Sequence, residues 1–238
     1  MFVHLHVHSY YSFLRSPTPV SAYVRKAAEY GMPALALTDH HCLSGAVEFH
    51  RTACELGIKP IQGAEITTED GYHLTLLACN KVGYQNLCQL ITAGFQASRT
   101  QPQIPWEKLA QHHQGLLVLT GCRRSAIWQA LLRKQYHHAL EYLNRLIKIF
   151  GKENIYLEMT NTYLPKTSAV LAAIAELSDH THVPLVATNN VHYLDKNDFP
   201  LYDLLTCTRT LTTLNDIHPE RPLNAENYFA SPEEMAQR

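Results

Sequence analysis

Short apolar runs rich in β-branched residues alternate with amphipathic stretches of helical length along most of this 238-residue chain. The runs show little alternation of polar and apolar residues, as expected for strands buried on both faces of a sheet. Strands that alternate with helices favour an α/β fold built from βα units, and we predict a barrel of seven strands. An open doubly wound sheet is the main alternative, although no GxGxxG or phosphate-loop pattern supports a nucleotide-binding version of it. The seven runs are Phe2–His8, Ala34–His40, Pro60–Ile66, His73–Cys79, Leu116–Cys122, Ile155–Met159 and Pro184–Asn190.

Helix start and stop signals separate these runs. Thr18 followed by Pro19 predicts an N-cap with proline at the first helical position, and Gly31 ends that helix. Ser44 is the predicted N-cap of the next helix, which Gly57 stops. Apolar residues three and four apart predict further helices over residues 84–96, 123–133, 136–150 and 166–178.

Composition and charge exclude several classes of protein. The chain is 46% hydrophobic with a formal net charge of −1, so it has no general electrostatic attraction for nucleic acid or anionic membranes. No apolar run approaches the roughly 18 residues that span a bilayer, and the amino terminus lacks the pattern of a secretory signal. The six cysteines are scattered without a C-x-x-C pair, which argues against a disulfide framework or a zinc finger. We therefore expect a cytoplasmic protein that contacts DNA only weakly and has no membrane partner.

The periodic pattern weakens after Tyr193, and the following residues read as one helix, Phe199–Thr206, and an irregular polar segment. We therefore expect a barrel domain over residues 1–195 and a C-terminal extension over residues 196–238. Ser231-Pro232-Glu233-Glu234 is a capping box with proline at the first helical position, and four residues follow it. A helix that starts and is then cut short suggests a fragment of a longer polypeptide, and a short terminal helix is the alternative.

The chain contains 15 histidines, and several of them stand where predicted strands end. His6 and His8 are two residues apart, so both project from the same face of an extended strand. Strand ends converge on one face of a barrel, where imidazole, carboxylate and thiolate groups could hold a metal ion. A hydrogen-bonding or packing histidine and an inert buried thiol are the alternatives. The other residues of this kind at strand ends are Asp39, His40, Glu65, Cys122, Asn190 and His192.

Three positions near these strand ends need separate interpretation. Asp39 adjoins His40 and could orient a ligand rather than bind metal itself. Gly121 precedes Cys122 and allows a close approach of the backbone. His73 begins its run, so it lies at the wrong end of the strand unless that strand runs antiparallel or a loop folds inward.

Several motifs follow one another in an order that is typical of one family. They are His6-Val7-His8-Ser9, Leu37-Thr38-Asp39-His40, Gly63-Ala64-Glu65, His73-Leu74-Thr75-Leu76-Leu77, Asn80–Leu87, Leu119-Thr120-Gly121-Cys122-Arg123, Ala187–His192 and Ser231–Met235. This set resembles the polymerase-and-histidinol-phosphatase (PHP) family. It is most similar to the PHP domain at the N-terminus of bacterial DNA polymerase III alpha subunits, and it covers the chain from end to end. Phe13-Leu14-Arg15, Thr120–Arg124 and Leu223–Tyr228 indicate the error-prone branch.

The resemblance implies a distorted seven-stranded (β/α) barrel whose cleft binds up to three divalent ions in complete members, some of which hydrolyse phosphoesters. It assigns no catalytic residue here. It also implies that residues 196–238 lead toward a polymerase palm that this chain does not contain. The ligands that it implies are His6, His8, His40, Glu65, His73, Cys122 and His192.

Two positions depart from the full ligand set. The acid expected shortly after the first motif is replaced by Arg15 or Ser16, and the aspartate expected two residues before the last histidine is Asn190. Both changes remove negative charge that would offset the charge of several dications. We therefore predict a reduced site that holds one or two divalent ions, zinc or manganese, with weak or absent hydrolysis.

Three functions follow from the resemblance. The first is a structural and interaction module of an error-prone-type polymerase, with the rest of that polypeptide and replication or proofreading subunits as partners. This chain has no cluster of aspartates for a two-metal palm site, so it should not polymerise DNA alone. The second is a metal-dependent phosphoesterase, either a 3′–5′ exonuclease or a pyrophosphatase. The third is a histidinol-phosphatase-like phosphomonoesterase, against which the polymerase-like segment 224–235 argues.

Overall fold

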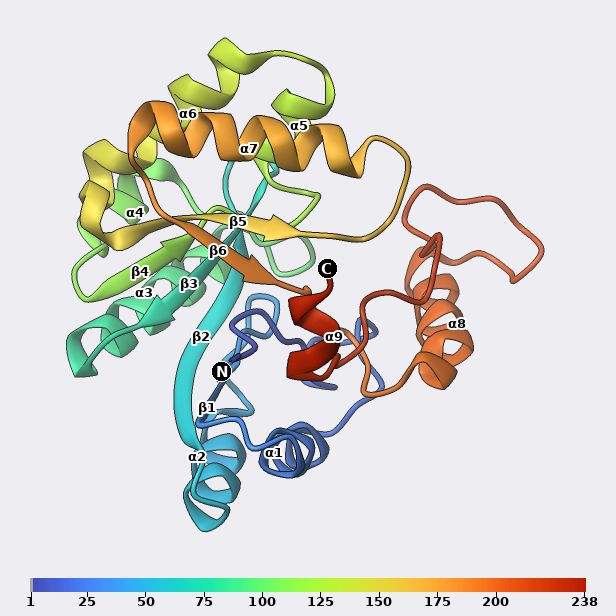
Figure 1. Ribbon diagram of the computed structural model, residues 1–238. Helices are drawn as coiled ribbons and strands as arrows, with labels where there is room; N and C mark the ends of the chain where they lie inside the picture. The colour runs from blue at the N-terminus through green and yellow to red at the C-terminus, as the bar shows by residue number, and fades with distance from the viewer. Residues whose placement is uncertain (1) are drawn as a thin grey trace. The chain divides into compact units, whose positions relative to one another are not determined.

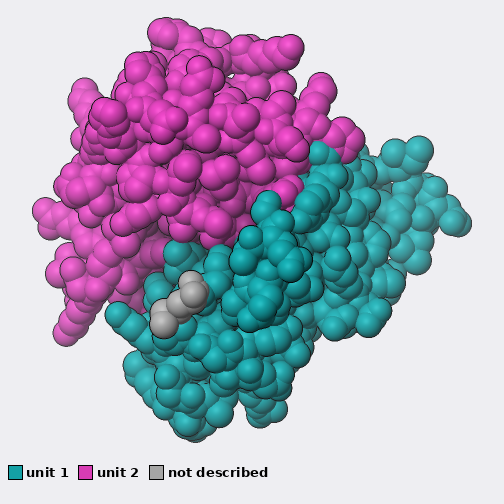
Figure 2. Space-filling view, in the orientation of Figure 1, with its two compact units in different colours: residues 1–61, 162–164, 189–238 teal, residues 62–161, 165–188 magenta. Residues whose placement is uncertain are grey.

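The computed structural model describes residues 2–238 and divides into two compact units (Figure 2). Unit 1 consists of residues 1–61, 162–164 and 189–238, and unit 2 consists of residues 62–161 and 165–188. Each unit is therefore assembled from segments that are distant in sequence. Within residues 2–238, no helix combines the length and the apolar sequence that crossing a lipid bilayer requires.

Six strands form one mixed sheet in the order β1-β2-β3-β4-β5-β6 (Figure 1). β3 runs antiparallel to both β2 and β4, whereas β4, β5 and β6 are parallel to one another. The predicted α/β class is confirmed. The described residues give six strands rather than seven, and the sheet is mixed, so a seven-stranded (β/α) barrel is not confirmed. The strands are β1 (Ala34–Leu37), β2 (Lys59–Thr67), β3 (His73–Ala78), β4 (Leu116–Leu119), β5 (Ile155–Thr160) and β6 (Leu185–Thr188).

The first predicted strand, Phe2–His8, is extended but is not a regular strand. Val7 forms a parallel bridge with Val191 on one side. On its other side, the backbone N–H of Val7 donates to the side-chain Oγ1 of Thr38 at 2.8 Å, and the Val7 carbonyl accepts from the Thr38 N–H at 2.9 Å. Because a side-chain oxygen replaces a backbone carbonyl in this pairing, no continuous ladder forms. In unit 1 the segment nevertheless lies between the end of β1 and the chain around Val191.

The predicted helices form, with shifts at their ends, and a short helix, α4, appears that the sequence pattern did not predict. Two predicted caps are wrong. α1 begins at Val20 with Pro19 at its N-cap position, because the Thr18 carbonyl accepts from the Tyr10 N–H at 2.9 Å and Thr18 stays outside the helix. Gly45 occupies the N-cap of α2, without a side-chain cap, in place of Ser44. The helices are α1 (Val20–Glu29), α2 (Ala46–Glu55), α3 (Lys81–Ala97), α4 (Trp106–Gln111), α5 (Ala126–Leu132), α6 (Tyr136–Phe150), α7 (Thr167–Thr181), α8 (Phe199–Thr210) and α9 (Pro232–Ala236).

Each unit has its own buried apolar residues. In unit 1, α1, α2 and β1 pack together with Val7, Val191 and Phe229. In unit 2, α6 and α7 lie against β5 (Figure 1). The strands of this unit bury side chains such as Leu76, Val118 and Leu157. The capping box at the start of α9 forms as predicted, with Ser231 Oγ accepting from the Glu234 N–H at 3.2 Å.

Candidate metal centre

The first segment of unit 1 places two imidazoles side by side. Because side chains alternate along an extended segment, Val7 packs in the hydrophobic core while His6 and His8 face the other way. All three residues are 0% exposed. Nε2 of His6 lies 3.2 Å from Nε2 of His8. The His-x-His spacing thus brings two imidazole nitrogens to one point of unit 1.

Ser12 determines which nitrogen of His8 carries the proton. Its hydroxyl donates to Oδ1 of Asp39 at 2.6 Å and lies 3.2 Å from Nδ1 of His8. Because the hydroxyl proton points to Asp39, Nδ1 of His8 is the donor in the second contact, and Nε2 is the lone-pair nitrogen. The same oxygen accepts the backbone N–H of His40 at 3.0 Å. One hydroxyl therefore connects the carboxylate with His8 and with the backbone of His40.

Asp39 is buried, and its hydrogen bonds with Ser9 and Ser12 connect it to His8 and His40. Its carboxylate also accepts from the backbone N–H of Ser9 at 2.6 Å and from the Ser9 hydroxyl at 2.8 Å. Burial raises the pKa of Asp39, and the hydrogen bonds from Ser12 and Ser9 oppose that rise. These contacts show Asp39 holding the 9–12 turn that orients His8.

His192 lies against His8 in the same unit. The two rings stack with centroids 4.4 Å apart and planes 10° apart, and Tyr202 stacks at 5.0 Å from His192. Nδ1 of His192 lies 2.8 Å from the backbone carbonyl of Arg15, which can only accept, so Nδ1 carries the proton. Nε2 of His192 is then the lone-pair nitrogen, as in His8. Arg15, where an acid was expected, contributes its backbone to this contact.

Asn190 precedes His192 by two residues and has a left-handed backbone, with φ of 45°. Among residues 2–238, no group donates a hydrogen bond to its buried side-chain Oδ1. A buried carbonyl oxygen without a donor is costly unless a donor or a cation is present. The amide oxygen of Asn190 therefore suits a cation, although it brings no charge.

Unit 2 brings together three of the predicted residues. Nδ1 of His73 lies 2.9 Å from Oε1 of Glu65. Sγ of Cys122 lies 3.4 Å from the same Glu65 oxygen and 3.9 Å from Nδ1 of His73. His73 begins its strand, yet β3 runs antiparallel to β2 and pairs His73 with Thr67. The start of β3 is thus next to the end of β2, which places His73 beside Glu65.

Close backbone packing and burial shape the position of Cys122. Gly121 has a φ of 93°, and a Cβ atom there would lie 2.5 Å from the His73 carbonyl oxygen, so the glycine allows the approach. Burial and, after it, the Glu65 carboxylate raise the pKa of the Cys122 thiol well above its usual value. The thiol is therefore neutral near pH 7 unless a cation stabilises the thiolate.

The spacing within each group suits a metal ion. Zinc–nitrogen and zinc–oxygen distances near 2.0–2.1 Å in a tetrahedral site put two such ligand atoms about 3.3 Å apart, and a sulfur and a nitrogen about 3.6 Å apart. The separations of 3.2 Å in the His6–His8 pair and of 2.9, 3.4 and 3.9 Å in the Glu65–His73–Cys122 group lie close to these values. The donor set, nitrogen with carboxylate oxygen and sulfur, is also one that zinc accepts. Within each unit, these residues therefore fit a divalent ion.

One protein-family profile matches most of this chain. The PHP domain profile matches residues 4–162. The chain belongs to the PHP domain family. As a PHP domain, it carries the histidines, glutamate and cysteine described above on segments that the profile covers, apart from His192.

Curated relatives of this PHP domain are DNA polymerases. It is 44% identical to an error-prone DNA polymerase of Symbiobacterium thermophilum, over 100% of this chain and 23% of that protein. It is 34% identical to a DNA polymerase III subunit alpha of Treponema pallidum, over 99% of this chain and 22% of that protein. These relatives confirm the resemblance to polymerase III alpha-type proteins, and the chain spans less than a quarter of their length.

Among solved structures, the PHP domain matches a two-domain protein from Bacteroides vulgatus that contains a predicted PHP-like metal-dependent phosphoesterase. The sequence identity is 15% and the TM-score 0.47, with 80% of this chain and 51% of that chain covered.

The sequence pattern missed one buried acid in unit 2. Glu158 in β5 is 1% exposed and accepts a hydrogen bond from the Thr188 hydroxyl. Its backbone N–H donates to Oγ1 of Thr120 at 3.0 Å, two residues before Cys122. Its charge adds to the rise in the pKa of Cys122. A single glutamate inside the apolar run Ile155–Met159 was the available signal.

Proposed function

We propose that this chain is the PHP domain of a bacterial error-prone-type DNA polymerase of the polymerase III alpha class. The match of the whole chain to such polymerases, at 44% identity in one case, carries this proposal. Residues 1–195 would form the domain proper and residues 196–238 an extension toward the rest of the polypeptide. The domain would act in the cytoplasm, in replication or repair synthesis, mainly through stability and partner contacts. Replication or proofreading subunits are the further partners we propose.

We also propose that the domain binds one or two divalent ions, zinc or manganese. The two groups in units 1 and 2 support this, because each has ligand-type atoms at suitable distances and His8 and His192 have their Nδ1 protons fixed elsewhere. A bound dication supplies charge that stabilises the Cys122 thiolate and, in a hydrolytic site, activates water. The residues that would hold such ions are His6, His8, His40 and His192 in unit 1 and Glu65, His73 and Cys122 in unit 2.

The loss of two carboxylates favours the structural function over catalysis. Arg15 and Asn190 replace acids, so fewer charges offset the ions and stabilise water as hydroxide. The second candidate is a metal-dependent phosphoesterase that removes nucleotides from DNA 3′ ends or hydrolyses pyrophosphate. The complete Glu65–His73–Cys122 group is the observation that favours it.

Elemental analysis of the 238-residue chain, purified without added metal, tests the proposal. We expect zinc or manganese in the wild-type chain, less metal in His8→Ala, and wild-type content in His138→Ala, which changes an exposed histidine of α6. Chelation should lower the melting temperature of the wild-type chain and of His138→Ala more than that of His8→Ala. Equal metal contents in all three proteins would contradict metal binding by these residues.

Activity assays separate the two candidates. With manganese or zinc added, the structural function predicts no release of nucleotides from DNA 3′ ends and no hydrolysis of pyrophosphate. Turnover by the wild-type chain that His8→Ala and Glu65→Ala both abolish would establish the phosphoesterase instead. Primer extension by this chain alone would contradict the assignment of the polymerase site to another part of the polypeptide.

A further inference from the structure

Asn227 contacts the backbone around Asn190 from across unit 1. Its side-chain Nδ2 donates to the carbonyl of Asn189 at 3.3 Å and to the carbonyl of Asn190 at 3.0 Å. The backbone carbonyl of Asn227 accepts the backbone N–H of His192 at 2.8 Å. One residue therefore holds three peptide groups of the segment that carries Asn190 and His192.

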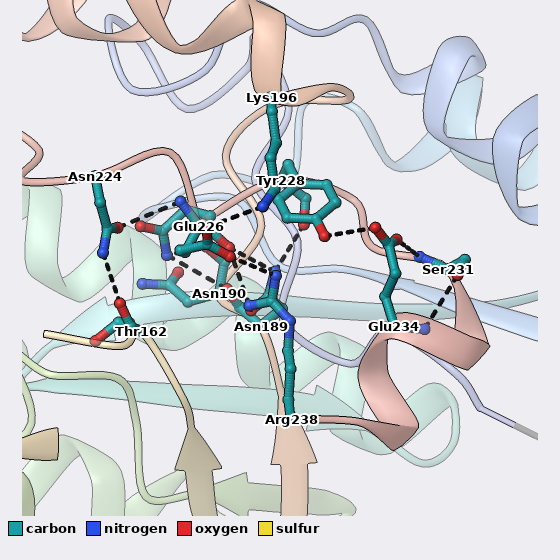
Figure 3. Close-up of polar contacts among 11 residues, drawn as sticks. Thr162, Asn189, Asn190, Lys196, Asn224, Glu226, Tyr228, Ser231, Glu234 and Arg238 are labelled. Atoms are coloured by element: carbon teal, nitrogen blue, oxygen red, sulfur yellow. Dashed lines mark hydrogen bonds and ion pairs between the residues drawn. The ribbon is translucent and has the colours of Figure 1, made fainter. Parts of the chain in front are cut away.

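The side chain of Asn189 in turn contacts the backbone on both sides of Asn227. Its side-chain Nδ2 donates to the carbonyls of Glu226 at 2.8 Å and Tyr228 at 2.7 Å, which flank Asn227. Its Oδ1 accepts from Nη1 of Arg238 at 2.7 Å. Asn189 is 1% exposed, so all its polar side-chain atoms need such partners. The segments 189–192 and 226–228 are thus joined in both directions (Figure 3).

We call the joined segments 189–192 and 226–228 the clamp. Arg238 and Lys196 fix Glu226, the first residue of its second segment. Nη2 of Arg238 lies 2.8 Å from one carboxylate oxygen of Glu226, and Nζ of Lys196 lies 2.9 Å from the other (Figure 3). The guanidinium also lies 5.1 Å from the ring centre of Tyr228. The Arg238 side chain is only 6% exposed, so its geometry is held by packing as well as by charge.

The clamp acts where the backbone is strained. A left-handed conformation is unfavourable for an L-residue, and asparagine is among the residues that adopt it most readily. Asn190 has this conformation, with φ of 45°, and the direction of the chain two residues later sets where the His192 ring lies. Without the bonds from Asn227, the segment can relax to a more favourable φ, and His192 then turns away from His8.

We propose that Asn227, braced by Glu226 and Arg238, is a positioning residue for Asn190 and His192 in the metal site. The proposal rests on the metal binding proposed above and adds residues that lie beyond the matched family region, which ends at residue 162. Asn227 contacts no imidazole; it acts through the backbone. Removing partners that orient ligands in this way typically lowers metal affinity about 10-fold to 100-fold.

Zinc affinity of the 238-residue chain, measured by competition with a chromophoric chelator, tests the clamp. We expect Asn227→Ala to bind zinc about tenfold more weakly than the wild-type chain. Asn86→Ala is the matched control, because Asn86 of unit 2 donates to the Gln114 carbonyl at 2.8 Å instead of to the 189–192 segment. It should change zinc affinity less than about twofold, since its side chain does not touch the ligand backbone.

Two further measurements distinguish positioning from a general loss of structure. In a His192→Ala background, Asn227→Ala should have a smaller further effect on zinc affinity, because only Asn190 is left for it to position. The melting temperature in the presence of a chelator reports whether each variant folds. If Asn227→Ala does not fold, Asn227→Asp keeps the shape and the backbone carbonyl while removing the donor, and it should weaken zinc binding as well.

The outcomes separate this inference from the proposed function. If Asn227→Ala weakens zinc binding no more than Asn86→Ala does, or weakens it equally in the His192→Ala background, the clamp alone is overturned. A wild-type chain that binds no zinc would overturn the proposed metal site and the clamp together.

Discussion

His4 makes the stability of unit 1 sensitive to acid. The residue is 0% exposed, and its ring centre lies 4.3 Å from that of Phe229 and 4.9 Å from that of Phe2. Nε2 donates to the Ala230 carbonyl at 2.9 Å, so Nδ1 is the buried lone-pair nitrogen. Burial, opposed by the bond to Ala230 and aided by the charge of Arg238, lowers the pKa of His4 from 6.5 to about 4.

The sign of the effect follows from proton binding. Between pH 6.5 and about 4, the unfolded chain protonates His4 and the folded chain does not. The free energy of unfolding therefore decreases as the pH falls through this range and increases as the pH is raised. At pH 5 the difference between the two pKa values contributes about 2 kcal/mol of destabilisation relative to pH 7.5.

Urea unfolding at pH 7.5 and pH 5.0 measures this contribution. His4→Gln keeps a donor for the Ala230 carbonyl and does not titrate, so it should lose about 2 kcal/mol less than the wild-type chain when the pH is lowered. His138→Gln makes the same change at an exposed position of α6 and should follow the wild-type chain. An equal loss in His4→Gln and in the wild-type chain would refute the reasoning.

Two further predictions concern packing and the metal charge balance. Gly83→Ala in α3 puts a Cβ 1.9 Å from the Gly115 carbonyl oxygen, so urea unfolding should show a loss of about 3 kcal/mol. Gly94→Ala in the same helix, whose nearest neighbour would be 3.4 Å away, should be neutral or stabilising by up to about 1 kcal/mol, and a comparable loss there would contradict the packing argument. Restoring acids with Arg15→Asp and Asn190→Asp should increase the metal content found by elemental analysis, because both changes add charge that offsets a dication. Unchanged metal content would show that the missing charges do not limit binding.

Local sequence patterns predicted the elements that form through short-range interactions. Six of the apolar runs form strands, because a short apolar run rich in β-branched residues is typical of a strand that is buried in a sheet. The capping box at Ser231 formed because its two partners are three residues apart. Phe2–His8 does not form a regular strand, because the Val7 N–H donates to the side-chain Oγ1 of Thr38 instead of to a backbone carbonyl. No local sequence pattern predicts this contact.

Some features of the candidate metal site follow from the sequence alone, and others depend on the tertiary structure. The sequence alone determined which residues have ligand chemistry and that His6 and His8 share a face, since the period of an extended chain is two residues. Only the tertiary structure decided that His73 lies beside Glu65, because that depends on the direction of β3 relative to β2. It also decided that Asn227 holds the backbone of Asn190. Contacts between residues dozens of positions apart depend on how whole elements pack, and that packing is not encoded in any one stretch of the chain.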